Sequence, residues 1–405
     1  MDFSLEYTAE QEEFAKTVRE WLKVNVPSGL VNVRDTVKMD QEQWQKRREF
    51  TRKLGQQGWL YPGYPREYGG GGLDEDQRFV LMQELAIPGL GLPPLYDTGV
   101  LAAPAVMAYG TEEQKKRFLP LIFKGEVLTW QLFTEPEAGT DEANQQTNAL
   151  RSVREKDYFV VNGQKIFVGS FPSKPEQLYL LTRSDLKAPR HQNLSSFLIP
   201  ADLPGITVQP LDLFPLSTFA SVSGSTAANI AGVKHSVFFD DVRIHESHLI
   251  GREGEGWKVT NATLEVEHSG GAGIVRDFVA EKFLDQCRNN SNVLSRLKEN
   301  PQLPDSLVEI YIGAQIERLF SMRNMAGKGG RYEGPQLSLF SKMFGTRVTA
   351  AMAQVLGPST FTDDLQWGMD EGIFEVGQRC GICLAPGGTP EALKIGIARA
   401  LAIGR

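Results

Sequence analysis

The stretch LFTEPEAGTDEA, residues 132–143, lies where the apolar pattern of the chain changes from helical to β. Its proline and glycine argue against regular structure, so we expect an irregular loop that carries hydroxyl groups at Thr134 and Thr140. Such a loop can present hydroxyl and backbone N–H groups to a phosphate or a heterocycle. Taken alone, this composition is a weak indication of a ligand site.

The chain before this loop predicts helices separated by loops. In residues 9–24, AEQEEFAKTVREWLKV, the helical period places four apolar side chains on one face. Thr8 followed by Gln11 resembles a capping box. The segment 61–72, YPGYPREYGGGG, is too rich in Pro and Gly for regular structure. Helices are expected at 74–86 and again after Thr111.

The chain after the loop predicts short strands. Residues 157–169, DYFVVNGQKIFVG, contain two β-rich runs around Asn162 and Gly163, which together predict a hairpin. Further strands are expected at 176–184, 194–202, 205–211 and 235–244. Because no helices interrupt them, they predict a small antiparallel barrel or sandwich. The Ser/Ala/Gly-rich residues 217–235 are expected to form a long mobile loop.

From about residue 254 the helical period returns and predicts a four-helix bundle. The four long helices are expected at 256–286, 305–329, 335–357 and 389–405. The predicted fold class is therefore α+β. The predicted domains are an N-terminal helical domain at 1–126, a middle β domain at 127–250 and a C-terminal helical bundle at 251–405.

Composition narrows the functional classes. The 405 residues carry a net charge of −7, which argues against nucleic-acid binding. No apolar run is long enough to span a membrane, and the N-terminus resembles neither a signal nor a transit peptide. Cys287, Cys380 and Cys383 do not form a disulfide framework, and the CxxC pair lacks the second pair of a structural zinc site. We expect buried thiols, no metal and a cytoplasmic protein.

The stretch NATLEVEHSGGAG, residues 261–273, contains two glutamates that a helix would point in nearly opposite directions. Glu265 shares a stripe with Lys258 and faces water, whereas Glu267 shares a stripe with Leu264 and faces the core. An inward carboxylate is a candidate for chemistry because its burial is costly unless it is paired, coordinated or neutral. A buried ion pair or helix contact explains Glu267 equally well on these residues alone. The small residues after it favour close approach of a flat ligand or another backbone.

Residues 132–143 also resemble the TEPxAGSD-type signature of the acyl-CoA dehydrogenases. Other motifs of this family follow in family order over nearly the whole chain: GWLYPGYPREYGGGG (58–72), YGTEEQKKRFLPLIFKGE (109–126), VNGQKIFVGS (161–170), VFFDDVRI (237–244) and GGTPEALKIGIARALAIG (387–404). The resemblance implies a helical–β–helical architecture with FAD held between the β domain and the C-terminal bundle. It also implies dehydrogenation of an acyl-CoA to a trans-2-enoyl-CoA.

The resemblance carries over specific contacts. The residues expected to bind FAD, with Thr134 bonded to the isoalloxazine edge, are Gln131, Leu132, Phe133, Thr134, Thr140, Phe167, Gly169, Gln354, Gly357, Gly388, Thr389 and Glu391. The residues expected to contact the acyl-CoA are Thr140, Glu265, His268 and Gly387, the last through its backbone N–H. The resemblance further implies electron-transfer flavoprotein or an equivalent acceptor, and a homo-oligomer or a pair with a homologous subunit.

The resemblance also locates the base. Many family members carry it at the position of Gly387, whereas a second subgroup carries it on the first bundle helix in an L..ER context. LEVEH matches that context, which implies that Glu267 removes the α-proton. Phe167, Gly169 and His268 replace the usual Trp, Thr and Arg. Residues 287–319 lack the common R..FG motif and resemble divergent bacterial enzymes for steroid side chains and other bulky acyl groups.

Two other functions stay open at this point. The chain could be a weakly active or structural partner subunit of a heteromeric dehydrogenase. It could also carry out oxidase, reductase or desulfinase chemistry on an acyl-CoA. Flavin stoichiometry and copurification address the first alternative, and oxygen reactivity addresses the second.

Overall fold

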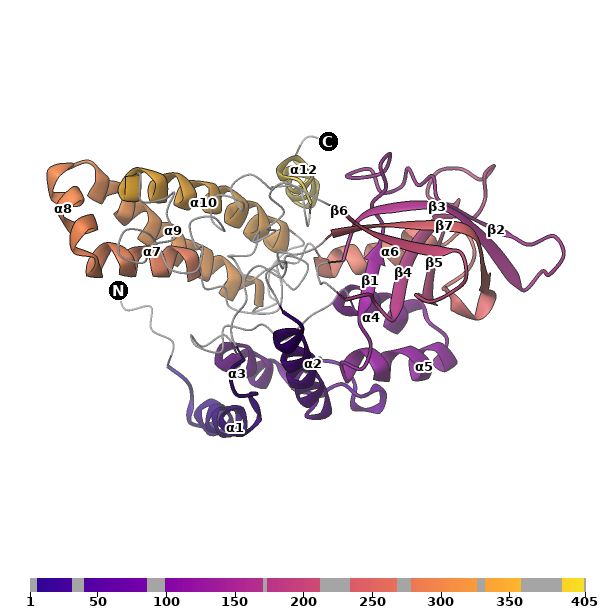
Figure 1. Ribbon diagram of the computed structural model, residues 1–405, viewed down its shortest axis with the longest axis horizontal. Helices are drawn as coiled ribbons and strands as arrows, with labels where there is room; N and C mark the ends of the chain where they lie inside the picture. Colours follow the sequence, from indigo (N-terminus) through magenta and orange to yellow (C-terminus); the bar gives the residue numbers. More distant parts are fainter. Residues whose placement is uncertain are drawn as a thin grey trace. The chain divides into compact units, whose positions relative to one another are not determined.

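The computed structural model describes residues 6–30, 40–85, 99–169, 173–211, 234–267, 278–325, 332–357 and 388–403. The chain divides into two compact units, and the division falls within helix α6 after Leu264. The first unit holds the N-terminal helices, the β-sheet and most of α6, and the second holds the helices that follow α6 (Figure 1). The predicted mixed architecture is confirmed, whereas the predicted domain boundaries at 126–127 and 250–251 stay predictions.

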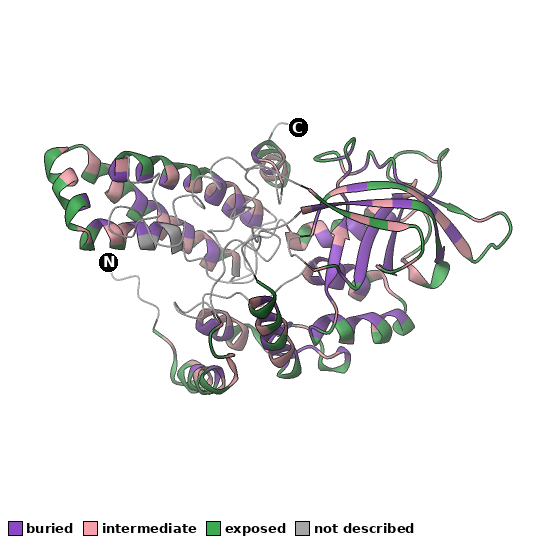
Figure 2. Cartoon of the chain, in the orientation of Figure 1, coloured by how far each residue is buried: buried purple, intermediate pink, exposed green. Residues whose placement is uncertain are grey.

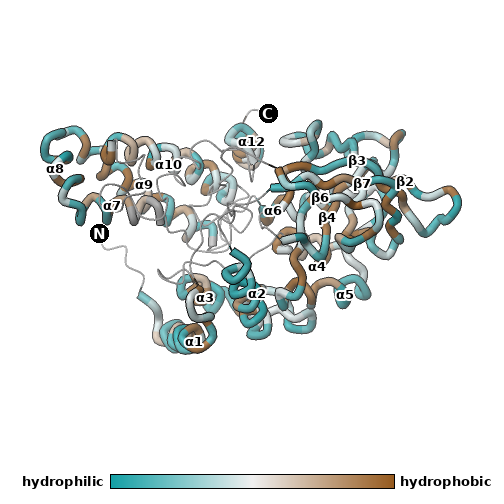
Figure 3. Tube along the Cα trace, in the orientation of Figure 1, coloured by the Kyte–Doolittle hydropathy of each residue, from teal (hydrophilic) through white to brown (hydrophobic). Residues whose placement is uncertain are grey.

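The N-terminal helices are α1 (Ala9–Asn25), α2 (Gln41–Gln56), α3 (Glu75–Leu85), α4 (Gly99–Tyr109) and α5 (Glu112–Phe123), with a 3₁₀ turn η2 at Arg66–Tyr68. Two of these helices, α1 and α5, begin at caps that the sequence predicts. Thr8 and Gln11 form the predicted capping box of α1, and Thr111 and Gln114 form a second one at α5. Helix α2 consists mostly of hydrophilic residues (Figure 3).

The strands of the first unit form one sheet. They are β1 (Thr129–Leu132), β2 (Asn148–Arg151), β3 (Tyr158–Val168), β4 (Gln177–Arg183), β5 (Leu194–Pro200), β6 (Ile206–Leu211), β7 (Lys234–His245) and β8 (Leu249–Ile250). The order is β6-β7-β3-β2-β4-β5-β8, with β1 beside β4. The sheet is not purely antiparallel as predicted, because β4 pairs in parallel with both β1 and β2. Strands β4 and β5 are buried over most of their length (Figure 2), as expected for strands covered on both faces.

The predicted hairpin at Asn162 and Gly163 is wrong. Both residues lie inside the continuous strand β3, where the pairing with β7 shifts register between Val161 and Gly163. The amide group of Asn162 exchanges two hydrogen bonds with Asp241, one of 3.0 Å to its carboxylate and one of 2.9 Å from its backbone N–H. Because the pairing shifts register here, the Asn-Gly pair lies in a β-bulge of β3 opposite β7, and not in the turn of a hairpin.

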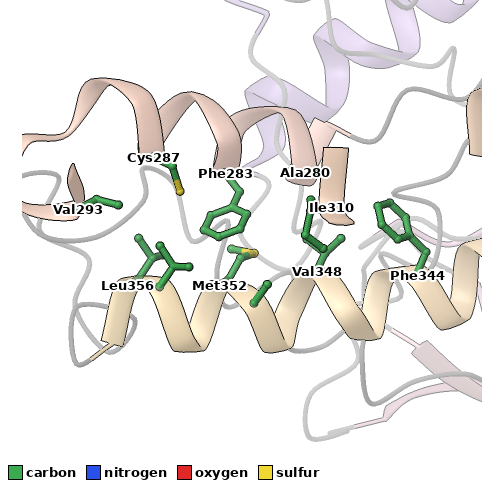
Figure 4. Close-up of a cluster of buried hydrophobic side chains, with 11 residues drawn as sticks. Ala280, Phe283, Cys287, Val293, Ile310, Phe344, Val348, Met352 and Leu356 are labelled. Carbon is green, nitrogen blue, oxygen red and sulfur yellow. The ribbon is translucent and has the colours of Figure 1, made fainter. Parts of the chain in front are cut away.

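The C-terminal helices are α6 (Gly256–Glu267), α7 (Phe278–Asn289), α8 (Ser291–Glu299), α9 (Leu303–Met325), α10 (Glu333–Leu356) and α12 (Pro390–Ala400). Residues of α7, α8, α9 and α10 form a second apolar core. Residues of the predicted helix 256–286 appear as α6 and α7, and 268–277 lie outside the described residues. Phe283 of α7 lies over Met352 of α10 in the cluster of Figure 4, and Phe344 lies further along α10.

Cys287 is one of the buried residues of this cluster, as predicted. Burial raises the pKa of its thiol to about 12, so the residue behaves as a small apolar side chain. Cys380, Cys383 and residues 217–233 of the predicted loop lie outside the described residues. Among the helices that the structure describes, none combines the length and apolar character needed to cross a membrane.

Candidate active site

A buried ion pair fixes the loop between β1 and β2. Nζ of Lys165 lies 2.7 Å from Oε1 of Glu135, with side-chain exposures of 0% and 2%. The same nitrogen donates to the backbone carbonyls of Phe133 (3.2 Å) and Leu181 (2.6 Å) and to the side chain of Gln145. Four oxygens therefore surround one group that has three N–H donors. Burial lowers the pKa of Lys165 to about 8, and the Glu135 carboxylate opposes this effect.

Glu135 connects this cation to the far end of the loop. Its carboxylate accepts hydrogen bonds from the backbone N–H groups of Gln146 (2.6 Å) and Thr147 (3.1 Å). The loop is thus tied down at both ends by one pair of charges. This pair was not predicted from the sequence, although Lys165 is separated from the buried Phe159 and Val161 by an even number of positions, as expected for side chains on one face of a strand.

The predicted flavin residues at the start of this loop differ in exposure. Leu132 and Phe133 are buried, Gln131 and Thr134 are half-buried, and Thr140 is exposed. The backbone N–H of Ile166 donates to the Thr134 carbonyl at 3.0 Å. This bond brings the loop beside the end of β3, which carries the other two predicted flavin residues of the first unit.

That end of β3 has an unusual backbone. Phe167 and Gly169 have φ angles of +60° and +74°, and Phe167 is 50% exposed. A Cβ placed on Gly169 would lie 2.6 Å from Cε2 of Trp130. Nζ of Lys234 donates to the Gly169 carbonyl at 2.6 Å. Position 169 therefore accepts only glycine, because Trp130 fills the space that a side chain would need.

Trp130 is a residue that the sequence analysis overlooked. Its side chain is 1% exposed and stacks on His235 with ring centroids 4.6 Å apart. Within the described part of the chain, its Nε1 has no hydrogen-bond partner. Burial lowers the pKa of His235, with Lys234 acting in the same direction. The ring stacked on Trp130 is therefore neutral near pH 7.

Helix α6 presents the two glutamates to different environments. Its buried face consists of Gly256, Val259, Thr260 and Thr263. Glu267 lies one turn beyond Thr263 on that face and is half-buried, whereas Glu265 is exposed on the same side as Lys258. His268 and the small residues that follow lie outside the described residues. The role of Glu267 as a base stays a prediction.

The remaining predicted contacts belong to the second unit. Arg296 of α8 donates to the Gln354 carbonyl at 3.1 Å, close to Gly357, which has φ +58° at the end of α10. Gly388 has φ +89° before α12. Figure 1 shows α8 and α12 at opposite ends of α10. The structure therefore does not bring these two groups of residues together within one chain.

The start of α12 is built from the remaining predicted residues. The Thr389 hydroxyl accepts from the Ala392 backbone N–H at 3.2 Å and caps the helix, and Glu391 is exposed in the first turn. Gly387, the predicted donor to the thioester, lies outside the described residues. No cluster of metal-ligating side chains occurs in the ranges that the structure describes.

The chain is similar to several characterised dehydrogenases. It is 26% identical to acyl-CoA dehydrogenase FadE26 of Mycobacterium tuberculosis, over 99% of this chain and 98% of that protein. Its fold matches a solved structure described as a Tcur3481-Tcur3483 steroid ACAD, with a TM-score of 0.78, 26% identity and complete coverage of both chains. It also matches the ChsE4-ChsE5 complex from Mycobacterium tuberculosis, with a TM-score of 0.76, 25% identity and complete coverage of both chains.

Two family descriptions match consecutive parts of the sequence. Residues 8–126 match the acyl-CoA dehydrogenase N-terminal domain, and residues 131–218 match the acyl-CoA dehydrogenase middle domain. Together they span more than half of the chain, and the solved structures extend the likeness through the C-terminal helices. The chain belongs to the acyl-CoA dehydrogenase family, whose members are FAD-dependent oxidoreductases.

Proposed function

We propose that this chain converts an acyl-CoA thioester to the trans-2-enoyl-CoA and that Glu267 removes the α-proton. The observation that carries this proposal is that Glu267 is half-buried and lies one turn after the buried Thr263, while Glu265 is exposed to solvent. A carboxylate at the margin of a buried helix face can be closed off from water when a substrate covers it. Such a group suits general base catalysis.

The reaction needs one group that accepts the α-proton and another that accepts the β-hydride. The Glu267 carboxylate accepts the proton that leaves the α-carbon next to the thioester carbonyl. FAD, when bound, supplies the acceptor for the hydride that leaves the β-carbon. As charge develops on the thioester oxygen, a backbone N–H stabilises it, and the resemblance assigns this donor to Gly387.

The residues at the end of β3 fit a flat cofactor. Phe167 exposes half of its ring, and the hydrogen bond between Ile166 and Thr134 holds the neighbouring loop beside it. The ion pair of Glu135 and Lys165 keeps that loop in place from the buried side. We assign the Thr134 hydroxyl to the isoalloxazine edge, and the exposed Thr140 to the pyrophosphate and the thioester arm.

We propose that the acyl group is bulky. This part of the proposal is supported by the similarity to a protein described as a steroid ACAD. Purified protein should be tested against acyl-CoAs with short linear, long linear, branched and ring-bearing acyl groups, using an artificial electron acceptor. A preference for the ring-bearing thioesters is expected, and a clear preference for linear ones would contradict it.

We also propose that a second subunit, identical or homologous, completes the cofactor site. Gln354 is bonded to α8 and Gly388 precedes α12, and Figure 1 shows α8 and α12 at opposite ends of α10. Helix α9 exposes Val308, Tyr311, Ile312 and Leu319, an unusual amount of apolar surface for one helix. Similar solved structures are described as paired complexes. Light scattering that finds an active, FAD-loaded monomer would contradict this assembly.

The decisive experiment replaces the proposed base. Glu267→Gln keeps the shape of the side chain but removes its ability to take a proton, so flavin reduction by acyl-CoA should slow by about 10²–10⁴-fold. FAD released by heat should remain near one per chain, because the change is nearly isosteric. Glu265→Gln is the matched control and is expected to alter only the apparent affinity for acyl-CoA. Flavin reduction at the parent rate in Glu267→Gln would show that another group is the base.

The FAD content of the purified protein and the oxygen reactivity of its reduced flavin separate the remaining alternatives. A chain that binds no added FAD, or that copurifies with an active homologue, would favour a structural partner subunit. Rapid reaction of the substrate-reduced protein with oxygen would favour an oxidase. We expect a yellow protein, slow oxygen reaction and fast transfer to an artificial acceptor.

A further inference from the structure

We propose that Tyr179 and Thr263 anchor helix α6 and thereby set the position of Glu267. This inference rests on the proposed role of Glu267 as the base. Tyr179 and Thr263 are positioning residues, because they act on the reaction only through the helix that carries the carboxylate.

The anchor is a short chain of buried hydrogen bonds. The hydroxyl oxygen of Tyr179, on β4, lies 3.0 Å from Oγ1 of Thr263, on α6. Oγ1 of Thr263 lies 3.0 Å from the carbonyl oxygen of Leu101, on α4. All three residues are fully buried. One hydroxyl of α6 is therefore bound to the sheet on one side and to an N-terminal helix on the other.

The direction of these bonds follows from the number of protons. A carbonyl oxygen can only accept, so the single proton of the Thr263 hydroxyl is donated to Leu101. The proton between Tyr179 and Thr263 must then come from Tyr179. Burial raises the pKa of Tyr179, so this phenol keeps its proton throughout the working pH range. The anchor does not itself titrate.

The same helix is fixed at its first residue. Oγ of Ser196, on β5, donates to the Gly256 carbonyl at 3.4 Å, and a Cβ on Gly256 would lie 2.5 Å from the carbonyl carbon of Leu194. The start of α6 is thus seated directly on the sheet. Because the first residue of α6 is held against the sheet, the hydrogen bonds of Thr263 determine the direction in which the helix continues.

Thr263 lies where a shift of its backbone would also shift Glu267. The two residues are four positions apart, which is one helical turn on the same face. The ring of Tyr179 also contacts Phe133 of the candidate flavin loop, with centroids 5.2 Å apart. One residue of the sheet therefore touches the predicted cofactor loop and the helix of the predicted base. A small displacement between a base and its substrate can cost about 10²-fold in rate.

A neighbouring residue of the same helix supplies a matched control. Thr260 is also fully buried, but its Oγ1 has no hydrogen-bond partner within the described residues. Thr263→Val and Thr260→Val are the same chemical change, one turn apart. If the hydrogen bonds of Thr263 matter, only the first change should impair the reaction. A loss of general helix stability would affect both.

The experiment uses the FAD-loaded protein and a single turnover with saturating acyl-CoA. Thr263→Val is expected to slow flavin reduction by about 10–100-fold with little change in the apparent Kd for acyl-CoA. Its kinetic isotope effect with α-deuterated substrate should rise, because proton removal becomes slower. Amides of residues 256–267 should exchange with deuterium faster. Thr263→Ser should restore most of the rate, and Thr260→Val should behave as the parent does.

Tyr179→Phe gives an independent variant of the same bond. It should slow the reaction in the same direction. The loss in the double variant with Thr263→Val should be smaller than the sum of the two single losses, because both single changes remove the bond between Tyr179 and Thr263. Parental rate and isotope effect in a flavin-loaded Thr263→Val would overturn the inference. Glu267→Gln is measured alongside. If Glu267→Gln reduces its flavin slowly while Thr263→Val does so at the parental rate, only the proposed anchor is wrong. If both variants reduce their flavin at the parental rate, the proposed base and the proposed anchor are both wrong.

Discussion

Nζ of Lys165 and Oε1 of Glu135 lie 2.7 Å apart and are almost completely shielded from water. Their pairing joins the end of β3 to the loop that the sequence singles out for ligand binding. The charge of each residue is acceptable in the interior only because the other is present. The shape of the loop therefore depends on two side chains that are not exposed to any ligand.

Replacing Lys165 by Met should leave the Glu135 carboxylate buried without its cation. Breaking such a pair typically costs about 3–5 kcal/mol of unfolding free energy. We expect chemical denaturation to show a loss of this size, with reduced FAD content. The double variant Glu135→Gln with Lys165→Met should recover part of the loss, because no lone charge remains. A single variant as stable as the parent would contradict this account of the loop.

Gly169→Ala should destabilise the first unit because its Cβ would meet the ring of Trp130 at 2.6 Å. The positive φ adds a cost of roughly 1–3 kcal/mol for a residue with a side chain. In a Trp130→Ala background the clash is relieved, so the same substitution should cost less. Gly139→Ala is the control, because no atom lies within 4 Å of its Cβ position. Equal losses in both backgrounds, measured by denaturation, would show that Trp130 does not restrict position 169.

A buried histidine, His235, and a half-buried one, His248, should make the protein less stable in mild acid. Burial lowers the pKa values of His235 and His248 in the folded chain. An unfolded histidine titrates near a pKa of about 6.5, so below that pH the unfolded chain binds more protons than the folded one. The unfolding free energy should therefore fall as the pH drops from 7.5 to 5.5.

A substitution can test the origin of that pH dependence. His235→Phe keeps a ring on Trp130 but removes the titrating group, so the loss of stability between pH 7.5 and 5.5 should become smaller. His245→Gln is the control, because His245 is exposed on β7. An unchanged pH dependence in His235→Phe would assign the acid sensitivity to other groups.

The sequence predicts best what depends on neighbours along the chain. The capping box predicted at Thr8 and the threonine cap predicted at Thr111 depend on residues at most three positions away, and both are present. The opposite directions of Glu265 and Glu267 follow from helical geometry alone. The hairpin prediction failed because Asn162 binds Asp241, which lies 79 positions away. Local turn preference was outweighed by pairing between distant strands.

The site residues that the sequence did not predict were missed for the same physical reason. Glu135 and Lys165 are 30 positions apart, and Tyr179 and Thr263 are 84 positions apart. Each residue has an ordinary identity in its own segment, and only the folded arrangement makes it part of a network. Family resemblance drew attention to Gly169, but its cause became visible only when Trp130 was found against it.

The pairing of β3 with β7 also bears on how the protein is made. One edge of β3 can pair with β2 as soon as both have left the ribosome, but its other edge must wait for Lys234–His245. At about 5–20 residues per second, that delay lasts several seconds. An unpaired strand edge is a template for wrong association. The nascent chain therefore carries an open, aggregation-prone edge beside the candidate flavin loop, and chaperones that bind extended segments should improve its yield.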